Sequence, residues 1–271
     1  DTTSAFASAL GAFYAGAKIA HVGGGLRTGD MANPFPEEGH RTMATRLASL
    51  HLAATARARA ALKAEGIHPG KVEVTGSPIV DTLRKALALE APIEADLASW
   101  IEGRKLAVLT VRRSDRLGEG AAGVVEAIRV LHDRDAALRW ALVLRRDHAP
   151  SDILRAQLQG LERVRFLDRM PYPVFLTLLK RASILLTDAG GILEEAPSLG
   201  IPVVLLADKT SRVEALEGGW AELAGTDPKR IQQAFDAYRR RWLAPRAPSP
   251  YGDGHAAARI VAALRRKIGL R

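Results

Sequence analysis

Short apolar runs alternate along the chain with longer stretches in which apolar residues recur every three or four positions. The runs have the length and composition of strands, and the longer stretches have the periodicity of helices. Strands that alternate with helices predict parallel sheets joined by right-handed crossovers. The predicted strands are Lys18–Val22, Leu50–Ala54, Lys71–Thr75, Leu106–Val111, Leu138–Leu144, Val164–Leu167, Ser183–Thr187 and Pro202–Leu206.

Helical periodicity fills the intervals between these runs. The predicted helices are Thr2–Tyr14, Thr55–Glu65, Val80–Leu89, Gly120–His132, Pro173–Leu179, Ile192–Leu199 and Lys229–Arg240. Another helix is expected to begin at Glu37, and a last one after the breaker cluster at 243–254. Breaker residues near 76–78 separate a first domain, 1–78, from a second, 79–250, with a C-terminal helix at 251–271. The chain opens on a helix rather than a strand, so we expect the first domain to be incomplete.

Composition narrows the class of protein. Of the 271 residues, 47% are apolar, which is enough for a sizeable core. No run approaches the roughly 18–20 apolar residues that span a bilayer. The absence of cysteine excludes a disulfide scaffold and fits a cytoplasmic protein. The net charge of +9 would suit an anionic partner, but the arginines are scattered over amphipathic helices and aromatic residues make up only 5%. We therefore expect most of this charge to form a solvated surface and some of it to serve a phosphorylated small molecule, rather than nucleic acid.

Functional groups are expected at the carboxyl ends of the parallel strands, where such sheets bind ligands. After the strand ending at Thr187, the sequence Asp188-Ala-Gly-Gly leads into a predicted helix. Glycines before a helix N-terminus let backbone N–H groups approach a phosphate, and a carboxylate such as Glu195 can accept both hydroxyls of a ribose. An ordinary turn before a capped helix explains the same stretch equally well.

Five other stretches carry candidate groups. Glu37 and Glu38 in "NPFPEEGHR" could include a general base in a stiff loop, or simply favour the helix dipole. Arginines in "TVRRSDRLGEG" and "LRRDHAP" suit an anion or an exposed surface. "DKTSRVEALEGG" follows the last predicted strand, and "SPYGDG" precedes the last helix; for both, a solvated loop is the simpler interpretation. No HExxH, Walker A, GxSxG or GxGxxG pattern is present.

Seven stretches taken together resemble the non-hydrolysing UDP-N-acetylglucosamine 2-epimerases. They are "DTT" at the start, "HVGGGLRTGD", "PFPEEGHR", "VTGSPIVDTL", "TDAGGILEEAPSLGIPVV", "TSRVEALEGG" and "SPYGDG", in the family's order and spacing. The resemblance implies two Rossmann-like parallel-sheet domains of GT-B type. It also implies a homodimer, a UDP-sugar substrate, no cofactor, no metal, and no nucleic-acid or membrane partner. The reaction implied is interconversion of UDP-GlcNAc and UDP-ManNAc by elimination and re-addition of UDP.

Roles transfer to this chain position by position. The resemblance implies that Asp1 and Glu37 are catalytic carboxylates, and that Arg112 is an electrostatic catalyst. The substrate-binding residues that it implies are Arg27, Arg41, Arg113, Asp188, Gly190, Gly191, Glu195, Arg212 and Glu214.

The chain departs from the pattern implied by the resemblance at four positions. Gly23 stands where the family has a catalytic glutamate, Arg112 where it has a histidine, Ala189 where it has a serine, and Asp147 where it has a further histidine. We interpret Gly23 as a missing carboxylate and Gly25 as a close approach of backbone to the ligand. Arginine stabilises a departing diphosphate but stays protonated, so it cannot shuttle a proton.

Three functions remain open. The first is an active epimerase, and the second is a catalytically impaired relative that still binds a UDP-sugar. The third is a GT-B glycosyltransferase, against which the "PFPEE" stretch argues because it is typical of the epimerases.

Overall fold

The computed structural model describes residues 1–112, 118, 120–146, 148–240 and 248–268, and contacts within it divide the chain into two compact units. Unit 1 comprises Asp1–Arg84, Lys209–Glu214 and Ser249–Arg271, and unit 2 comprises Lys85–Asp208 and Ala215–Pro248. The boundaries expected from the sequence divide the chain into continuous domains, and they stay a prediction.

Unit 1 is built on a parallel sheet in the order β1 (Ala20–Val22), β2 (Leu50–Ala53) and β3 (Val72–Val74). Alternate residues of β2 face opposite sides of the sheet. Leu50 and Leu52 pack against α13 (Ala256–Ile268), whereas Ala53 packs against α3 (Ala56–Ala64). The sheet is therefore covered by helices on both faces, which explains why β2 is buried along its whole length.

The remaining elements of unit 1 are tied together by caps and ion pairs. The hydroxyl of Thr2 accepts from the N–H of Ala5 at 3.2 Å and so caps α1 (Thr3–Tyr14), which contacts α2 (Glu37–Leu47). A short 3₁₀ helix, η1 (Pro69–Lys71), precedes β3, and α4 (Pro78–Leu87) follows it. In the "SPYGDG" stretch, the carbonyl of Tyr251 accepts from the N–H of Ser77 at 2.8 Å, and Asp253 pairs with Arg259 at 2.7 Å. This stretch therefore joins the last helix to the rest of unit 1.

Unit 2 holds a six-stranded parallel sheet in the order β6-β5-β4-β7-β8-β9. Its strands are β4 (Lys105–Thr110), β5 (Leu138–Val143), β6 (Val164–Leu167), β7 (Ile184–Thr187), β8 (Val203–Leu205) and β9 (Ala221–Leu223). Its helices are α5 (Ala95–Ile101), α7 (Ala121–Arg134), α8 (Ala149–Leu158), α9 (Tyr172–Arg181), η2 (Gly190–Glu194), α10 (Ala196–Leu199), α11 (Val213–Glu217) and α12 (Pro228–Arg240).

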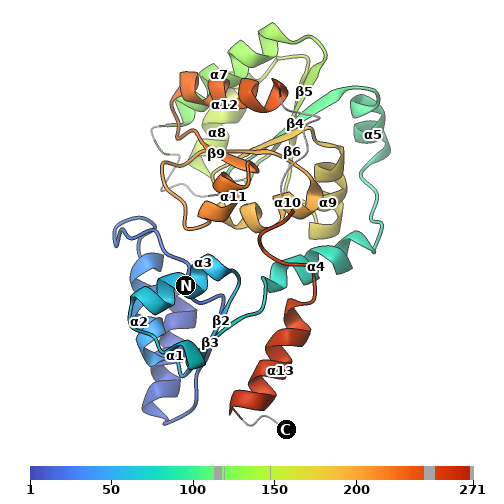
Figure 1. Ribbon diagram of the computed structural model, residues 1–271. Coiled ribbons are helices and arrows are strands. Elements are labelled where there is room, and N and C mark those ends of the chain that lie inside the picture. Colours follow the sequence, from blue (N-terminus) through green and yellow to red (C-terminus); the bar gives the residue numbers. More distant parts are fainter. Residues whose placement is uncertain (113–117, 119, 147, 241–247, 269–271) are drawn as a thin grey trace. The chain divides into compact units, whose positions relative to one another are not determined.

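Helices cover both faces of this larger sheet. Helices α7, α8 and α12 lie on one side, and α9, α10 and α11 lie on the other (Figure 1). The core under α7 and α12 includes Trp140 of β5, whose ring stacks on Phe235 at 5.7 Å between centroids. Both faces of the central strands are apolar, which is why these strands read as continuous apolar runs in the sequence.

The predicted α/β class with parallel sheets is confirmed, and all eight predicted strands are present. Strand β9 was missed because it has only three residues and carries a charged Glu222. Helices α5, α8 and α11 were also missed. The predicted helix Ile192–Leu199 is partly wrong, because Gly190–Glu194 form a 3₁₀ helix and α10 begins only at Ala196. Within the described residues, no helix is long and apolar enough to cross a membrane.

The glycine run offers a test of the packing in unit 1. Gly25 has a φ of +93°, and a Cβ built there would lie 2.2 Å from the carbonyl oxygen of Ala58 in α3. We expect Gly25→Ala to lower the free energy of unfolding by about 3 kcal/mol, from backbone strain and overlap together. Gly23 has a φ of +77° but open space around its Cβ position. Gly23→Ala should therefore cost only about 1 kcal/mol. Urea denaturation measures both, and equal losses would contradict this account.

Candidate functional site

A cavity of about 290 Å³ opens at the carboxyl ends of β4, β5 and β7 in unit 2. The groups that line it have three kinds of chemistry. Guanidinium groups come from Arg112, Arg145 and Arg169, a carboxylate from Glu195, and aromatic rings from Tyr172 and Phe175. Within the described part of the chain, no carboxylate forms an ion pair with these three arginines. The cavity is therefore suited to a ligand that carries several negative charges and an apolar or aromatic group.

Asp188 fixes the two central strands at the mouth of this cavity. It follows β7 directly, is fully buried, and accepts the backbone N–H of Arg112 at 2.8 and 3.1 Å. The hydroxyls of Thr110 and Thr187, the last residues of β4 and β7, lie 2.8 Å apart. These bonds hold the backbone of Arg112 in place. The carboxylate of Asp188 thus supports the loop, and the substrate contact expected for it stays a prediction.

Gly190 and Gly191 begin the 3₁₀ helix η2 rather than the α-helix that the sequence suggested. Because η2 is a 3₁₀ helix of only five residues, the helix dipole expected to favour a phosphate here is not available. A Cβ built at Gly191 would meet no other atom within 4 Å. The backbone at Gly191 is therefore open enough for a ligand to approach. The phosphate contact expected there from the sequence stays a prediction.

Glu195 is held from the first turn of α9. The hydroxyl of Tyr172 donates a hydrogen bond to Oε2 of Glu195 over 2.7 Å, and both residues line the cavity. Burial, together with this bond to the carboxylate, raises the pKa of Tyr172 above its ordinary value. The phenol thus remains a donor at any physiological pH.

In unit 1 the structure brings Asp1 and Arg41 together through an ion pair of 2.7 Å. Arg41 also bonds to Glu38 at 2.9 Å. Glu38 is 2% exposed and accepts the backbone N–H groups of Thr28 and Gly29 at 2.9 and 3.0 Å. Glu38 is therefore the carboxylate that shapes the "RTGD" loop, whereas Glu37 is half-buried in the first turn of α2.

The other unit 1 candidates are also bound within the unit. Arg27 donates to Oε2 of Glu65 at 3.0 Å and to the hydroxyl of Thr45 at 2.8 Å. Glu214 accepts from the hydroxyl of Thr55. The charge of Arg212 contributes to a lowered pKa for Arg41, for which burial is the largest cause. Arg113 and Asp147 lie outside the described residues.

Sequence reasoning missed several groups at these sites. Glu38 was not distinguished from its neighbour, although an acidic residue three positions before Arg41 could have indicated an ion pair along the helix. Arg145 stood in a stretch already suspected of binding anions. Nothing in the local sequence marks Tyr172 or Arg169, which lie between the end of β6 and the start of α9 and reach the cavity only in the folded unit.

The glycine run is a turn packed against α3. Packing explains why residue 25 is glycine, because a side chain there would overlap the backbone of Ala58 in α3, and the close approach of Gly25 to a ligand stays a prediction. A Cβ on Gly24 would lie 3.3 Å from Nδ1 of His21 and 3.4 Å from Nδ1 of His51. At Gly23 a Cβ would meet no other atom within 4 Å, and the interpretation of Gly23 as a missing carboxylate stays a prediction.

In the described part of the chain, no group of three or more His, Asp or Glu side chains is arranged to hold a metal ion. The fold and the cavity define an α/β protein with a ligand site at the carboxyl ends of a parallel sheet. Comparison with known proteins identifies the family.

A family model described as UDP-N-acetylglucosamine 2-epimerase matches residues 1–265. The UDP-N-acetylglucosamine 2-epimerase of Salmonella typhimurium is 33% identical over 98% of this chain and 73% of its own. Among solved structures, the S. aureus MnaA–UDP co-structure has 30% identity and a TM-score of 0.93, covering 100% of this chain and 73% of that one. The UDP-GlcNAc 2-epimerase from Neisseria meningitidis bound to UDP-GlcNAc has 30% identity and a TM-score of 0.90, covering 98% and 75%.

The chain therefore belongs to the UDP-N-acetylglucosamine 2-epimerase family, whose members are isomerases. The resemblance inferred from the seven sequence stretches is confirmed.

The histidine pair of unit 1 predicts a pH dependence. Burial, with the neighbouring His51, lowers the pKa of His21 to about 4; burial, with Arg27, lowers that of His51 to about 4. The unfolded value is about 6.5, so the unfolded chain binds more protons between these values. Stability from this source is present above pH 6.5 and is lost as the pH falls towards 4.

The free energy of unfolding of the wild type should fall as the pH is lowered from 7 to 5. We expect this fall to be about 2 kcal/mol smaller in His51→Leu. Urea denaturation at the two pH values measures it, and the same change at exposed His68 is the control. An unchanged pH response in His51→Leu would contradict the assignment.

Proposed function

We propose that this protein is an isomerase that interconverts UDP-GlcNAc and UDP-ManNAc by elimination and re-addition of UDP. The observation that carries the proposal is the cavity of unit 2, where three guanidinium groups, one carboxylate and two aromatic rings meet. These groups suit a diphosphate, a ribose and a base, respectively. Family membership and the UDP-bound relatives support the same ligand.

The chemistry requires a group that removes the proton on C2 and a clamp for the departing diphosphate. We assign proton transfer to Asp1 and Glu37, by the resemblance of their motifs to the family. Arg112 is proposed to stabilise the charge that develops on the leaving diphosphate. The proposed substrate contacts, by the same resemblance, are Arg27, Arg41, Arg113, Asp188, Gly190, Gly191, Glu195, Arg212 and Glu214. We further propose a cytoplasmic homodimer.

The second candidate function is a UDP-sugar-binding relative with impaired catalysis. It is favoured by Gly23, because this position offers no carboxylate although its surroundings have room for one. Proton NMR of the protein with UDP-GlcNAc in D₂O separates the two functions. Loss of the sugar C2 proton signal with growth of the manno epimer would establish epimerisation. A persistent C2 proton with line broadening of the nucleotide signals would establish binding without catalysis.

Restoring the carboxylate tests how Gly23 limits the reaction. We expect Gly23→Glu to raise the rate of C2 proton exchange by about tenfold or more, since a positioned acid–base group contributes roughly 10²–10⁴-fold. Gly23→Gln has the same backbone strain and nearly the same size but no charge, so it should leave the rate at or below the starting value. Equal rates in the two variants would show that the missing carboxylate does not limit this protein.

Two adjacent arginines test the diphosphate site. Arg145 lines the cavity, whereas Arg146 forms an ion pair with Asp168 and is not part of the lining. We expect Arg145→Gln to weaken UDP binding by about tenfold, through loss of a charge-assisted hydrogen bond. Arg146→Gln should leave the dissociation constant within a factor of two. Calorimetric titration with UDP measures both, and a reversed order of effects would contradict the assigned site.

A further inference from the structure

The bond between Tyr172 and Glu195 connects two elements that are distant in the chain. Tyr172 is the first residue of α9, directly after Pro171, and Glu195 lies at the junction of η2 and α10. The 2.7 Å bond therefore links the start of one helix to the point where another changes its geometry. Both side chains line the same 290 Å³ cavity.

Glu195 lies where a 3₁₀ helix meets an α-helix, so the orientation of its carboxylate depends on a partner from another element. The backbone of Glu195 has φ −94° and ψ −40° and makes the transition from a 3₁₀ to an α-helix. Oε2 of Glu195 accepts from the phenol, and an ionised carboxylate has about four acceptor sites over its two oxygens. The bond from Tyr172 thus orients the group and leaves capacity for further donors, such as a pair of neighbouring hydroxyls.

We infer that Tyr172 is a positioning residue that orients the Glu195 carboxylate towards the vicinal hydroxyls of the ribose in a bound nucleoside diphosphate. The inference rests on the proposed function and adds a specific consequence to it. The protein should prefer ribonucleotides to 2′-deoxyribonucleotides. This preference should depend on the hydroxyl of Tyr172, although Tyr172 itself contacts neither sugar oxygen.

A merely structural role for Tyr172 predicts something different. If the phenol only stabilised the start of α9 or the wall of the cavity, its loss would weaken all nucleotides alike. A positioning role weakens UDP, which offers both hydroxyls, more than 2′-deoxy-UDP, which keeps only the 3′-hydroxyl. The ratio of two affinities, rather than either affinity alone, therefore separates the two roles.

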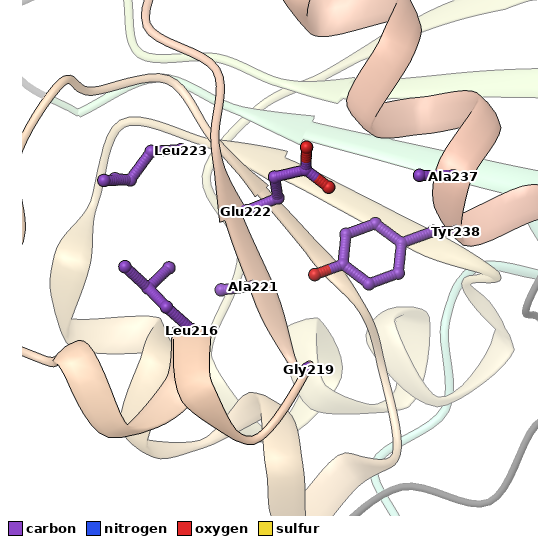
Figure 2. Close-up of a pocket in the computed structure, with 7 residues that line it drawn as sticks. All are labelled: Leu216, Gly219, Ala221, Glu222, Leu223, Ala237 and Tyr238. Atoms are coloured by element: carbon purple, nitrogen blue, oxygen red, sulfur yellow. The ribbon is translucent and has the colours of Figure 1, made fainter.

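The test is calorimetric binding of UDP and 2′-deoxy-UDP to the wild-type chain, Tyr172→Phe, Glu195→Gln and the double variant. Tyr238→Phe is the matched control, since this buried tyrosine of unit 2 lines a different cavity with Leu216 and Glu222 (Figure 2). Thermal unfolding of each variant shows that the fold is retained.

We expect the wild type and Tyr238→Phe to bind UDP about tenfold more tightly than 2′-deoxy-UDP, the effect of one or two hydrogen bonds to a charged group. Tyr172→Phe should lose most of this preference by weakening UDP more than 2′-deoxy-UDP. Adding Tyr172→Phe to Glu195→Gln should change the ratio no further, because the phenol acts through the carboxylate.

Two results would overturn the inference, and they are distinguishable. An unchanged preference in Tyr172→Phe, or equal weakening of both ligands, overturns the role of Tyr172 and leaves the proposed function intact. Failure of the wild-type chain to bind UDP overturns the proposed function and the inference with it.

Discussion

The buried carboxylate of Asp188 is the constraint on which the candidate site in unit 2 depends. A buried charge is costly unless it is hydrogen-bonded, and here two bonds from the N–H of Arg112 satisfy it. The same bonds join the ends of β4 and β7, the two central strands of the sheet. Hydrogen bonds to the backbone of residue 112, rather than contacts of its side chain, therefore fix its position. This explains how an arginine can occupy the place of the family's histidine without disturbing the rim of the cavity.

Arginine has different surroundings in the two units. In unit 1, Arg27 and Arg41 are bonded to the carboxylates of Glu65, Glu38 and Asp1. In unit 2, the guanidinium groups that line the cavity form no ion pair with a described carboxylate. Paired arginines order the loops and helices around them, and arginines without such partners attract an anion. Among the described residues, the arginines that line the cavity of unit 2 are thus suited to an anionic ligand such as the proposed diphosphate.

The glycine run contains two different constraints on the chain. Gly25 is required by packing, because any side chain there would overlap the backbone of α3. Gly23 needs only a positive φ, and the space around it is open. Packing therefore does not require a glycine at position 23. If this position lacks a carboxylate, as proposed, we expect the effect on proton transfer in the reaction rather than on the stability of the fold.

Local patterns were sufficient for most of the fold, since strands buried on both faces are apolar throughout and are recognisable wherever they are long enough. They failed at β9, where three residues and one charge carry too little signal, and at η2, where glycines and Pro197 prevent a regular helix. Motif order alone was also sufficient for the family. The partners of the functional groups were decided only by the folded chain. Arg27 with Glu65, and Tyr172 with Glu195, are separated by 38 and 23 residues. Such contacts depend on how whole elements pack, and no local spacing specifies that.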